Sequence, residues 1–89
     1  MEIAFDSSFK KAYNKKIKNR KESEELFWFA TELFLKDQFH TSLTTHKLSG
    51  KLKGMWSFSI KYDFRIVFYF ADNNTKIVFT YVGTHDEVY

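Results

Sequence analysis

The apolar residues of this 89-residue chain change their spacing at Gly50, and this change limits the folds open to it. Before Gly50 they recur every three or four positions, as in an amphipathic helix, and after it they alternate with polar residues, as in a strand. No proline, low-complexity tract or internal repeat divides the sequence. A chain of this size builds one core. We therefore expect a single domain over residues 1–89, with helices first and a sheet second.

Two helices are predicted in the first half. The first follows the polar residues at positions 6–8, each of which can cap a helix N-terminus, and its apolar stripe consists of Phe9, Ala12, Tyr13 and Ile17. The second begins at Ser23, with two glutamates in its first turn where the helix dipole favours anions. Its stripe consists of Leu26, Phe29, Ala30, Leu33 and Phe34. Phe27 and Trp28 widen that stripe, so this helix contacts both the sheet and the first helix, or a partner protein covers it.

Three strands are predicted in the second half, at residues 52–61, 63–71 and 76–82. The first two alternate strictly, with Leu52, Gly54, Trp56, Phe58 and Ile60 on one face of the first strand and Phe64, Ile66, Phe68 and Phe70 on one face of the second. Asp72-Asn73-Asn74 supplies the turn before the third strand, and residues 2–5 can add a strand. The expected fold class is α+β, with two N-terminal helices packed on a small antiparallel sheet of three to four strands. The other face of the sheet is expected to be partly polar and free.

Several classes of function are excluded or disfavoured by what the chain lacks. It has no cysteine, no HExxH motif and no glycine-rich phosphate-binding loop, so neither a metal site nor a cofactor is predicted. No apolar run approaches the roughly 18 residues of a membrane span, and the N-terminus lacks a signal peptide's pattern. A cytoplasmic protein with no membrane partner is the expectation.

Positive charge is concentrated in two segments. Residues 10–21 hold seven lysines or arginines without an acid, and residues 38–62 contain lysines but no carboxylate. Segregated positive charge favours binding to a polyanion, with nucleic acid first. A solvated lysine-rich surface explains the charge equally well. The candidate RNA-binding residues are Lys10, Lys11, Lys15, Lys16, Lys51 and Lys53.

Residues able to move protons surround the expected free face, and the candidates are His46, Asp63, Arg65, His85 and Tyr89. Imidazoles exchange protons near neutral pH, and a guanidinium can hold phosphate oxygens. RNA cleavage needs these groups, because a 2′-hydroxyl loses a proton, a phosphorane is stabilised and a 5′-oxygen gains a proton. Structural alternatives remain open: His46 can cap a loop, and Arg65 can pair with Asp63. His40 is assigned to a helix end.

Three ordered blocks in the C-terminal half carry a family resemblance: residues 46–54 (HKLSGKLKG), residues 62–68 (YDFRIVF) and residues 83–89 (GTHDEVY). With these blocks the chain resembles the RelE/YafQ-like toxins of bacterial type II toxin-antitoxin systems. The resemblance implies two helices against an antiparallel sheet. It also implies a ribosome-dependent mRNA endonuclease, with the ribosome and mRNA as partners and a cognate antitoxin that holds it inactive.

The resemblance also implies roles for single residues. His46, Asp63 and His85 match catalytic positions of YafQ-like enzymes, Tyr89 matches an aromatic residue beside the site, and Arg65 matches a Tyr-x-x-Arg strand of the wider family. The implied chemistry is metal-independent: His46 or Asp63 is the base, Arg65 stabilises the phosphorane and His85 is the acid, leaving a 2′,3′-cyclic phosphate and a 5′-hydroxyl. The chain departs from the pattern at positions that hold a histidine, a tryptophan and an arginine in that branch, here Ser59, Phe64 and Tyr81.

Two other functions keep the same fold. A ParE-like toxin would bind and inhibit DNA gyrase without acid-base residues, and a non-catalytic interaction module would need none either. The nuclease hypothesis requires that His46 and His85, which are 39 positions apart in the sequence, meet in one polar hollow beside Arg65.

Overall fold

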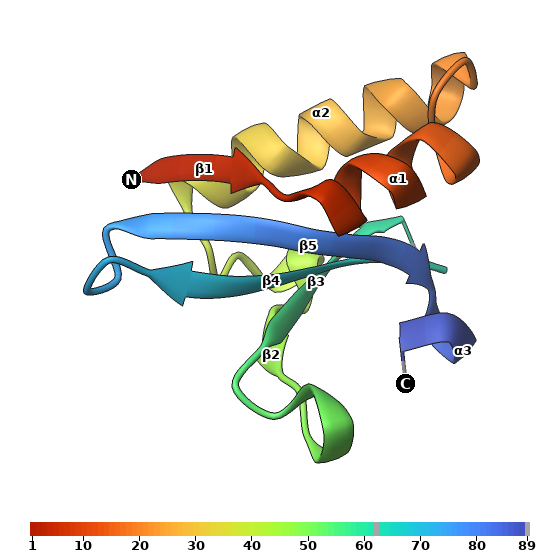
Figure 1. Cartoon of the computed structure of the whole chain (residues 1–89). Helices are drawn as coiled ribbons and strands as arrows, with labels where there is room; N and C mark the ends of the chain where they lie inside the picture. The colour runs from red at the N-terminus through yellow and green to blue at the C-terminus, as the bar shows by residue number, and fades with distance from the viewer. Residues whose placement is uncertain (62, 89) are drawn as a thin grey trace.

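The computed structural model describes residues 1–61 and 63–88 of the chain. Two helices lie on one side of a sheet, and two shorter segments project from its other side (Figure 1). The elements in chain order are β1 (Glu2–Phe5), α1 (Ser7–Lys16), α2 (Lys21–Lys36), the 3₁₀ helix η1 (Thr41–Leu43), β2 (His46–Lys47), the 3₁₀ helix η2 (Gly50–Leu52), β3 (Trp56–Lys61), β4 (Phe64–Ala71), β5 (Lys76–Thr84) and α3 (His85–Val88).

The sheet has five strands in the order β1-β5-β4-β3-β2. β1 pairs with β5 in parallel, whereas the other neighbours are antiparallel. The prediction of an antiparallel sheet of three to four strands is therefore wrong in two respects, although the α+β class is correct. β2 has only two residues, which are too few to show an alternating pattern, so its pairing with β3 could not be predicted from the sequence.

The first helix agrees with its predicted cap and stripe. Asp6 is the N-cap, and its carboxylate accepts hydrogen bonds from the Phe9 backbone N–H at 2.9 Å and from the Thr80 hydroxyl at 2.7 Å. This carboxylate thus satisfies a free N–H group at the helix terminus and also fixes α1 to β5. Phe9, Ala12 and Ile17 are buried, as the stripe predicts.

The predicted face of the second helix is partly wrong. α2 begins at Lys21, and it buries Ser23, Phe27, Ala30, Thr31 and Phe34. Phe29, assigned to the stripe, is 71% exposed, and Trp28 is 50% exposed. Almost every residue from 26 to 35 is apolar, so the sequence fixes the helix but not which face turns inward. Phe27 faces the rings of Phe9 and Phe79, so α2 does contact both α1 and the sheet.

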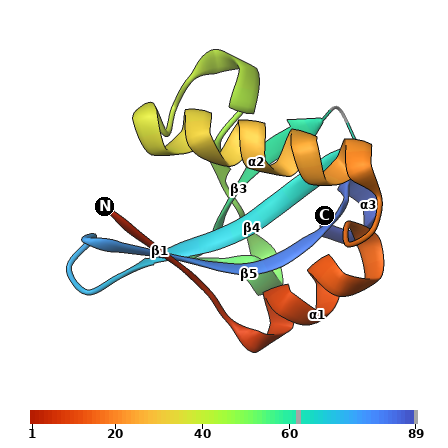
Figure 2. The same cartoon turned by 90° about the horizontal axis from the view of Figure 1, so that it is seen from above.

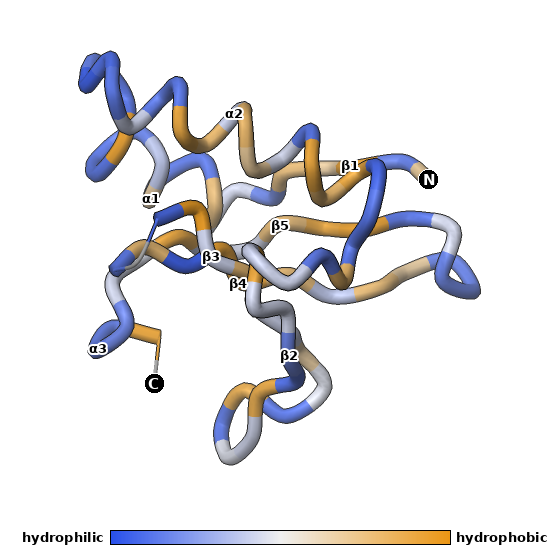
Figure 3. Tube along the Cα trace, turned by 180° about the vertical axis from the view of Figure 1, so that it is seen from behind, coloured by the Kyte–Doolittle hydropathy of each residue, from blue (hydrophilic) through white to orange (hydrophobic). Residues whose placement is uncertain are grey.

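Aromatic rings fill the space between the helices and the sheet. Phe34 stacks on Phe58 with ring centroids 4.4 Å apart, and Phe68 and Phe79 meet the same rings edge-on or tilted. α1 packs along β5 while α2 lies over β3 (Figure 2). Figure 3 shows hydrophobic stretches on α2 and on the strands below it, and a hydrophilic hairpin between β4 and β5. This core, in which each buried ring contributes about 1.5–3 kcal/mol, fixes the sheet that carries the candidate site.

The strand boundaries differ from the predicted ones in two places. β3 starts at Trp56, because Leu52 lies in η2 and Gly54 has a φ of +93° that extended chain does not adopt. β5 continues to Thr84 rather than stopping at residue 82. The alternation in β4 is correct: Ile66 and Phe68 are buried in the core, and Phe64 and Phe70 pack against it.

The face of the sheet turned away from α1 and α2 is neither free nor mainly polar. Val67 is buried there with Leu48 and Val88, and Leu52, Met55 and Tyr81 pack against them. These residues come from the segment around β2 and η2 and from α3, the two projections seen below the sheet in Figure 1. Among the described residues, no helix is long and apolar enough to cross a membrane.

Candidate functional site

The candidate site lies on this second face of the sheet, which we call the open face. Cross-strand pairing places His46 opposite Ser57, Ser57 opposite Val67, and Val67 opposite Tyr81, so these side chains share a face. The adjacent row contains Ser59, Arg65 and Gly83. Two borders flank the open face: residues 46–55, which we call the β2 segment, and α3. Leu48–Leu52 and Asp86–Val88 line a hollow of about 590 Å³ between them.

Arg65 is held by a hydrogen-bonded chain of hydroxyl groups. Its Nη1 donates to the Ser59 hydroxyl, which lies 2.8 Å from the Thr44 hydroxyl. The single proton of the Thr44 hydroxyl is donated to the Leu43 carbonyl oxygen at 2.7 Å. Ser59 must therefore donate to Thr44 and accept from Arg65, because each hydroxyl has one proton. The chain has a defined direction and orients the guanidinium.

The same threonine orients His46. The Nδ1 atom of His46 lies 2.8 Å from the Thr44 carbonyl oxygen. A carbonyl oxygen only accepts, so Nδ1 carries a proton and the neutral ring presents Nε2 as its basic atom. Thr44 has φ of 47° and ψ of 45°, a left-handed conformation that costs a β-branched residue about 1–3 kcal/mol. This conformation directs the Thr44 carbonyl to His46 and its hydroxyl to Ser59, so one strained residue links the candidate base to Arg65.

Arg65 borders a hollow of about 420 Å³, lined also by Ser42, Thr44, Ser59, Ile60 and Lys61. Its Nε is buried, and none of the described residues accepts a hydrogen bond from it. Leaving such a donor unpaired costs about 1–3 kcal/mol. A guanidinium with donors to spare beside a second cation, Lys61, is suited to an anion. Within residues 1–61 and 63–88 no ion pair joins Arg65 to Asp63, so that structural alternative is wrong.

Asp63 and His85 lie at the same end of the sheet as Arg65. The His85 backbone N–H donates to the Asp63 carbonyl oxygen at 3.0 Å, directly beyond the paired residues Phe64 and Thr84. Both side chains are exposed, and His85 Nδ1 lies 3.8 Å from a carboxylate oxygen of Asp86. The end of β5 thus brings the candidate acid next to Asp63 and close to the strand of Arg65.

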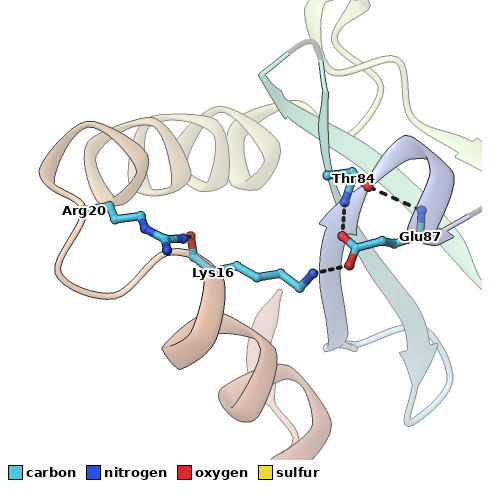
Figure 4. A network of polar contacts seen from close by, with 4 residues as sticks. All are labelled: Lys16, Arg20, Thr84 and Glu87. Atoms are coloured by element: carbon cyan, nitrogen blue, oxygen red, sulfur yellow. Dashed lines mark hydrogen bonds and ion pairs between the residues drawn. The ribbon is translucent and has the colours of Figure 1, made fainter.

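A network of polar contacts fixes α3 (Figure 4). Glu87 accepts from the Thr84 backbone N–H at 2.8 Å, and the Glu87 backbone N–H donates to the Thr84 hydroxyl at 3.4 Å, which makes a capping box around His85. The other Glu87 oxygen accepts from the Lys16 ammonium, 71 residues away in the sequence. The hydrogen bond from Lys16 is the main cause that lowers the pKa of Glu87 to about 2, and the same bond raises the pKa of Lys16.

The predicted RNA-binding lysines divide into two groups. Lys10, Lys11 and Lys15 are exposed on α1, and Lys51 and Lys53 are exposed on the β2 segment. Lys16 differs, because its ammonium binds Glu87 and lies 5.7 Å from the centre of the Tyr81 ring. Its charge is therefore occupied within the protein. Tyr89, the remaining candidate, lies outside the described residues.

The two histidines do not share one hollow, so the expectation that His46 and His85 meet in a polar hollow beside Arg65 is wrong. Neither lines the hollow beside Arg65, and in the sheet order β3 and β4 separate β2, which carries His46, from β5, which leads to His85. β2 and α3 project from the same side of the sheet (Figure 1), so the histidines belong to opposite borders of the open face. Arg65, on β4, lies between these borders.

Two residues of the site were missed as functional positions. Ser59 was considered only as a position that lacks a family histidine, and Thr44 was not considered at all. A serine facing an arginine across two strands is a detectable signal once the register is known. Nothing in the sequence around Thr44 indicates its left-handed backbone conformation, since a β-branched residue rarely adopts it. Among the described residues, no group of three or more histidine, aspartate or glutamate side chains is placed to hold a metal ion.

Comparison with known proteins places this geometry in context. The chain matches, over residues 1–89, the family model described as a bacterial toxin of a type II toxin-antitoxin system, YafQ. A search of curated protein sequences gives no match.

Solved structures share the fold across nearly the whole chain. A copper-bound mutant toxin from Helicobacter pylori is 24% identical with a TM-score of 0.75, covering 100% of this chain and 99% of that chain. YafQ from E. coli is 16% identical with a TM-score of 0.73, covering 99% and 97%. A YoeB/ParE toxin from Agrobacterium tumefaciens is 16% identical with a TM-score of 0.77, covering 96% and 99%. At these identities the likeness establishes the RelE-like fold.

Proposed function

Because the chain belongs to the YafQ family of toxins from type II toxin-antitoxin systems, as its three C-terminal sequence blocks suggested, we propose that it is a ribosome-dependent mRNA endonuclease. The observation that carries the proposal is the chain of hydrogen bonds from His46 through Thr44 and Ser59 to Arg65. It orients a potential base and a phosphate-binding cation together. A protein that only binds a partner has no need of such an arrangement.

Because His46 and His85 lie on opposite borders of the open face, the mechanism is proposed in a changed form, in which an RNA strand lies across Arg65 and each border supplies one proton-transfer residue. His46 accepts the proton of the 2′-hydroxyl through Nε2, and the 2′-oxygen attacks phosphorus. Arg65 stabilises the charge of the phosphorane, and His85 donates a proton to the 5′-oxygen as its bond to phosphorus breaks. The products are a 2′,3′-cyclic phosphate and a 5′-hydroxyl. Asp63 is the alternative base, and Tyr89 is proposed to position a base or phosphate.

Ser59 does not replace the family histidine as a proton carrier, because a hydroxyl does not titrate near neutral pH. Its role in this proposal is to hold the Arg65 guanidinium, to which it is hydrogen-bonded. We propose that cleavage needs no metal ion. Cleavage that persists in excess chelator supports this, and cleavage that stops and returns with added copper or zinc contradicts it.

The proposed partners are the ribosome and its mRNA, and an antitoxin that blocks them, all in the cytoplasm. Lys10, Lys11, Lys15, Lys51 and Lys53 are exposed and are proposed to contact RNA phosphates. Affinity for RNA should then fall steeply with added salt.

The test is message cleavage in a translation extract, with mapping of the new 5′ ends. Arg65→Ala should abolish the cuts, while Arg20→Ala, which removes an exposed arginine whose guanidinium donates to the Lys16 carbonyl oxygen, should keep them. Cuts that remain after both Arg65→Ala and His85→Gln would refute the mechanism. Intact messages together with inhibited DNA supercoiling would instead identify a gyrase inhibitor. If the protein neither cleaves messages nor inhibits supercoiling, the result would indicate an interaction module.

A further inference from the structure

A cavity beside the β2 segment is not part of the proposed cleavage site. It has a volume of about 810 Å³ and extends to the hairpin between β4 and β5. Trp56 and Phe70 supply aromatic surface, Lys47 and Lys53 supply positive charge, and Gln38 and Asn74 supply amide groups. Its described wall contains no carboxylate. Aromatic, cationic and amide side chains together are the groups that bind single-stranded nucleic acid.

Trp56 is held in place and is partly exposed. Phe39 and Phe70 meet its ring edge-on, with centroids 5.7 Å and 5.8 Å away. The Lys47 ammonium lies 5.4 Å from the centre of the ring, over its face. That face of the indole therefore attracts a cation from the solvent side, and it is reached without disturbing the core.

We propose that this cavity binds one nucleotide of single-stranded RNA, with the base against Trp56 and the phosphate against Lys47 and Lys53. The inference rests on the proposed function and extends it, since it places a message nucleotide away from the cleaved linkage. Stacking of a base on an aromatic side chain is worth about 1–3 kcal/mol and tolerates any base. In this arrangement Lys47 leaves the indole and pairs with the phosphate.

A path connects the cavity to the candidate site. The cavity and the hollow against α3 share Leu48, Ser49 and Gly50, so they lie on two sides of the same stretch of the β2 segment. Gly50 has a φ of +65°, and a Cβ atom placed on it would have no atom within 4 Å. An RNA strand can pass over this open position from one hollow to the other. The positive charge of the wall would attract RNA and an acidic protein alike. Only RNA can also stack a base on Trp56, so the two ligands can be distinguished by measuring that contact.

Tryptophan fluorescence tests the proposal, because the chain has two tryptophans, Trp28 and Trp56. Trp28 is on α2 and does not line this cavity, because it borders a separate hollow with Phe9 and Tyr13. Trp28→Phe leaves Trp56 as the only reporter, and a single-stranded RNA hexanucleotide at low salt should quench it. Trp56→Phe leaves Trp28, and the same RNA should not quench it. Matching thermal unfolding curves would show that both variants are folded.

Affinity supplies a second measurement. Trp56→Phe should weaken binding of the hexanucleotide about threefold and Trp56→Ala about tenfold or more. The double variant Lys47→Ala/Lys53→Ala should lower the affinity about tenfold and reduce the slope of log affinity against log salt by about 0.7, because both lysines contact one phosphate and about 0.7 is lost per phosphate contact on a single strand. Lys36→Ala, at the exposed end of α2, is the matched control and should change neither value.

The outcomes separate this inference from the proposed function. Cleavage by the wild type together with no quenching in Trp28→Phe would overturn the nucleotide site and leave the nuclease. Quenching without cleavage would retain the site and refute the nuclease. Quenching by an acidic peptide but not by RNA would identify a protein-binding surface and overturn the inference. In cleavage assays Trp56→Phe should raise KM with kcat unchanged.

Discussion

α3 and the β2 segment border the same face of the sheet, but they are attached to it in different ways. α3 has four residues, and it is held by a capping box, by the Lys16 ion pair and by the bond from the His85 N–H to Asp63. The β2 segment is held by a ladder of two residues and by local bonds such as Leu48 N–H to the Met55 carbonyl oxygen. It also turns at two glycines of positive φ. Polar contacts distant in sequence help to fix α3, whereas the polar contacts of the β2 segment are local, and the distant contacts of that segment are the apolar ones of Leu48 with Val67 and Val88.

This difference suggests a division of labour. The candidate acid, His85, is on the border that is joined to α1, so its position depends on the folded protein as a whole. The candidate base, His46, depends on Thr44 two residues before it. The positive charge that would meet RNA is concentrated on the local border, at Lys47, Lys51 and Lys53. In the proposed mechanism each border therefore carries one proton-transfer residue, and the local border also carries lysines proposed to bind RNA.

The largest expected effect on the cleavage rate comes from replacing either of the two candidate histidines. His46→Gln and His85→Gln should each reduce the cleavage rate by about 10²–10⁴-fold, the usual contribution of a general acid or base. The pH profiles should differ, because a base works when deprotonated and an acid when protonated. His46→Gln should remove the rise of rate with pH on the acidic side, and His85→Gln the fall on the alkaline side. Loss of the same limb in both variants would contradict the division.

Two glycine substitutions probe how tightly each border is attached. A Cβ atom at Gly83 would lie 2.6 Å from Tyr81 Cε2 and 3.0 Å from Glu87 Oε1, whereas one at Gly54 would meet nothing within 4 Å. Gly83→Ala should therefore displace α3 and destabilise the protein by about 1–3 kcal/mol, as overpacking does. Gly54→Ala should cost about 1–2 kcal/mol through its positive φ alone.

Thermal unfolding and cleavage assays should be measured together for these two variants. We expect Gly83→Ala to lose activity beyond its loss of stability, because it moves His85. A drop in cleavage from Gly54→Ala that equals or exceeds that of Gly83→Ala would show that α3 is not the better defined border.

A smaller effect is expected from the ion pair that joins α3 to α1. Glu87→Gln keeps the size of the side chain and its bond to Thr84, but it removes the charge that binds Lys16. Cleavage should fall about tenfold, as expected when a catalytic group is displaced by less than about 1 Å, with RNA affinity unchanged. Glu32→Gln, which makes the same exchange at an exposed position of α2, is the matched control and should have little effect. Equal losses in both variants would contradict a positioning role.

The same pair predicts a pH dependence of stability. The pKa of Glu87 is lowered to about 2 in the folded protein, so its contribution is present above its ordinary value of 4.5 and is lost as the pH falls towards 2. The pKa of Lys16 is raised above 10.5, so its contribution is present below that value and is lost as the pH rises beyond the raised one. The stabilities of wild type and Glu87→Gln should therefore differ most between about pH 5 and 10 and converge near pH 2.

The smallest effect concerns a single exposed lysine of the β2 segment. Lys51→Ala should lower RNA affinity about two- to threefold and the salt slope by about 0.7, with kcat unchanged, since one phosphate contact is lost. Filter binding at several salt concentrations measures both values. A change in kcat would show that Lys51 takes part in the chemistry and not only in binding.

Comparison of residues shows what the sequence could predict. The alternation of β4 placed Ile66 and Phe68 in the core correctly, because a period of two admits only one assignment of faces. The sequence did not restrict the inward face of α2 in this way, because apolar residues lie on nearly all sides of the helix between positions 26 and 35. The parallel pairing of β1 with β5 joins the two ends of the chain, and no local pattern encodes it.

The candidate site was predictable in its residue types but not in its connections. The proton-transfer and phosphate-binding chemistry of His46, Asp63, Arg65 and His85 singled them out, and the resemblance to the family then implied their roles. The resemblance could not supply the bond from Lys16 to Glu87, because a lysine in a basic run gives no sign of a partner 71 positions away. The capping box was present as Thr84-x-x-Glu87, and its pattern could have been found from the sequence.

The position of β5 sets the order in which the protein can assemble. β5 lies between β1 and β4 and is the last strand of the described chain. It also binds the N-terminus of α1, because the Thr80 hydroxyl donates a hydrogen bond to the Asp6 carboxylate. A nascent chain that stops before residue 76 has β1 and α1 but lacks the strand that both require. β1 and α1 therefore gain their contacts with the sheet only after residues 76–84 have been made, and the sheet closes last at the strand that joins its two parts.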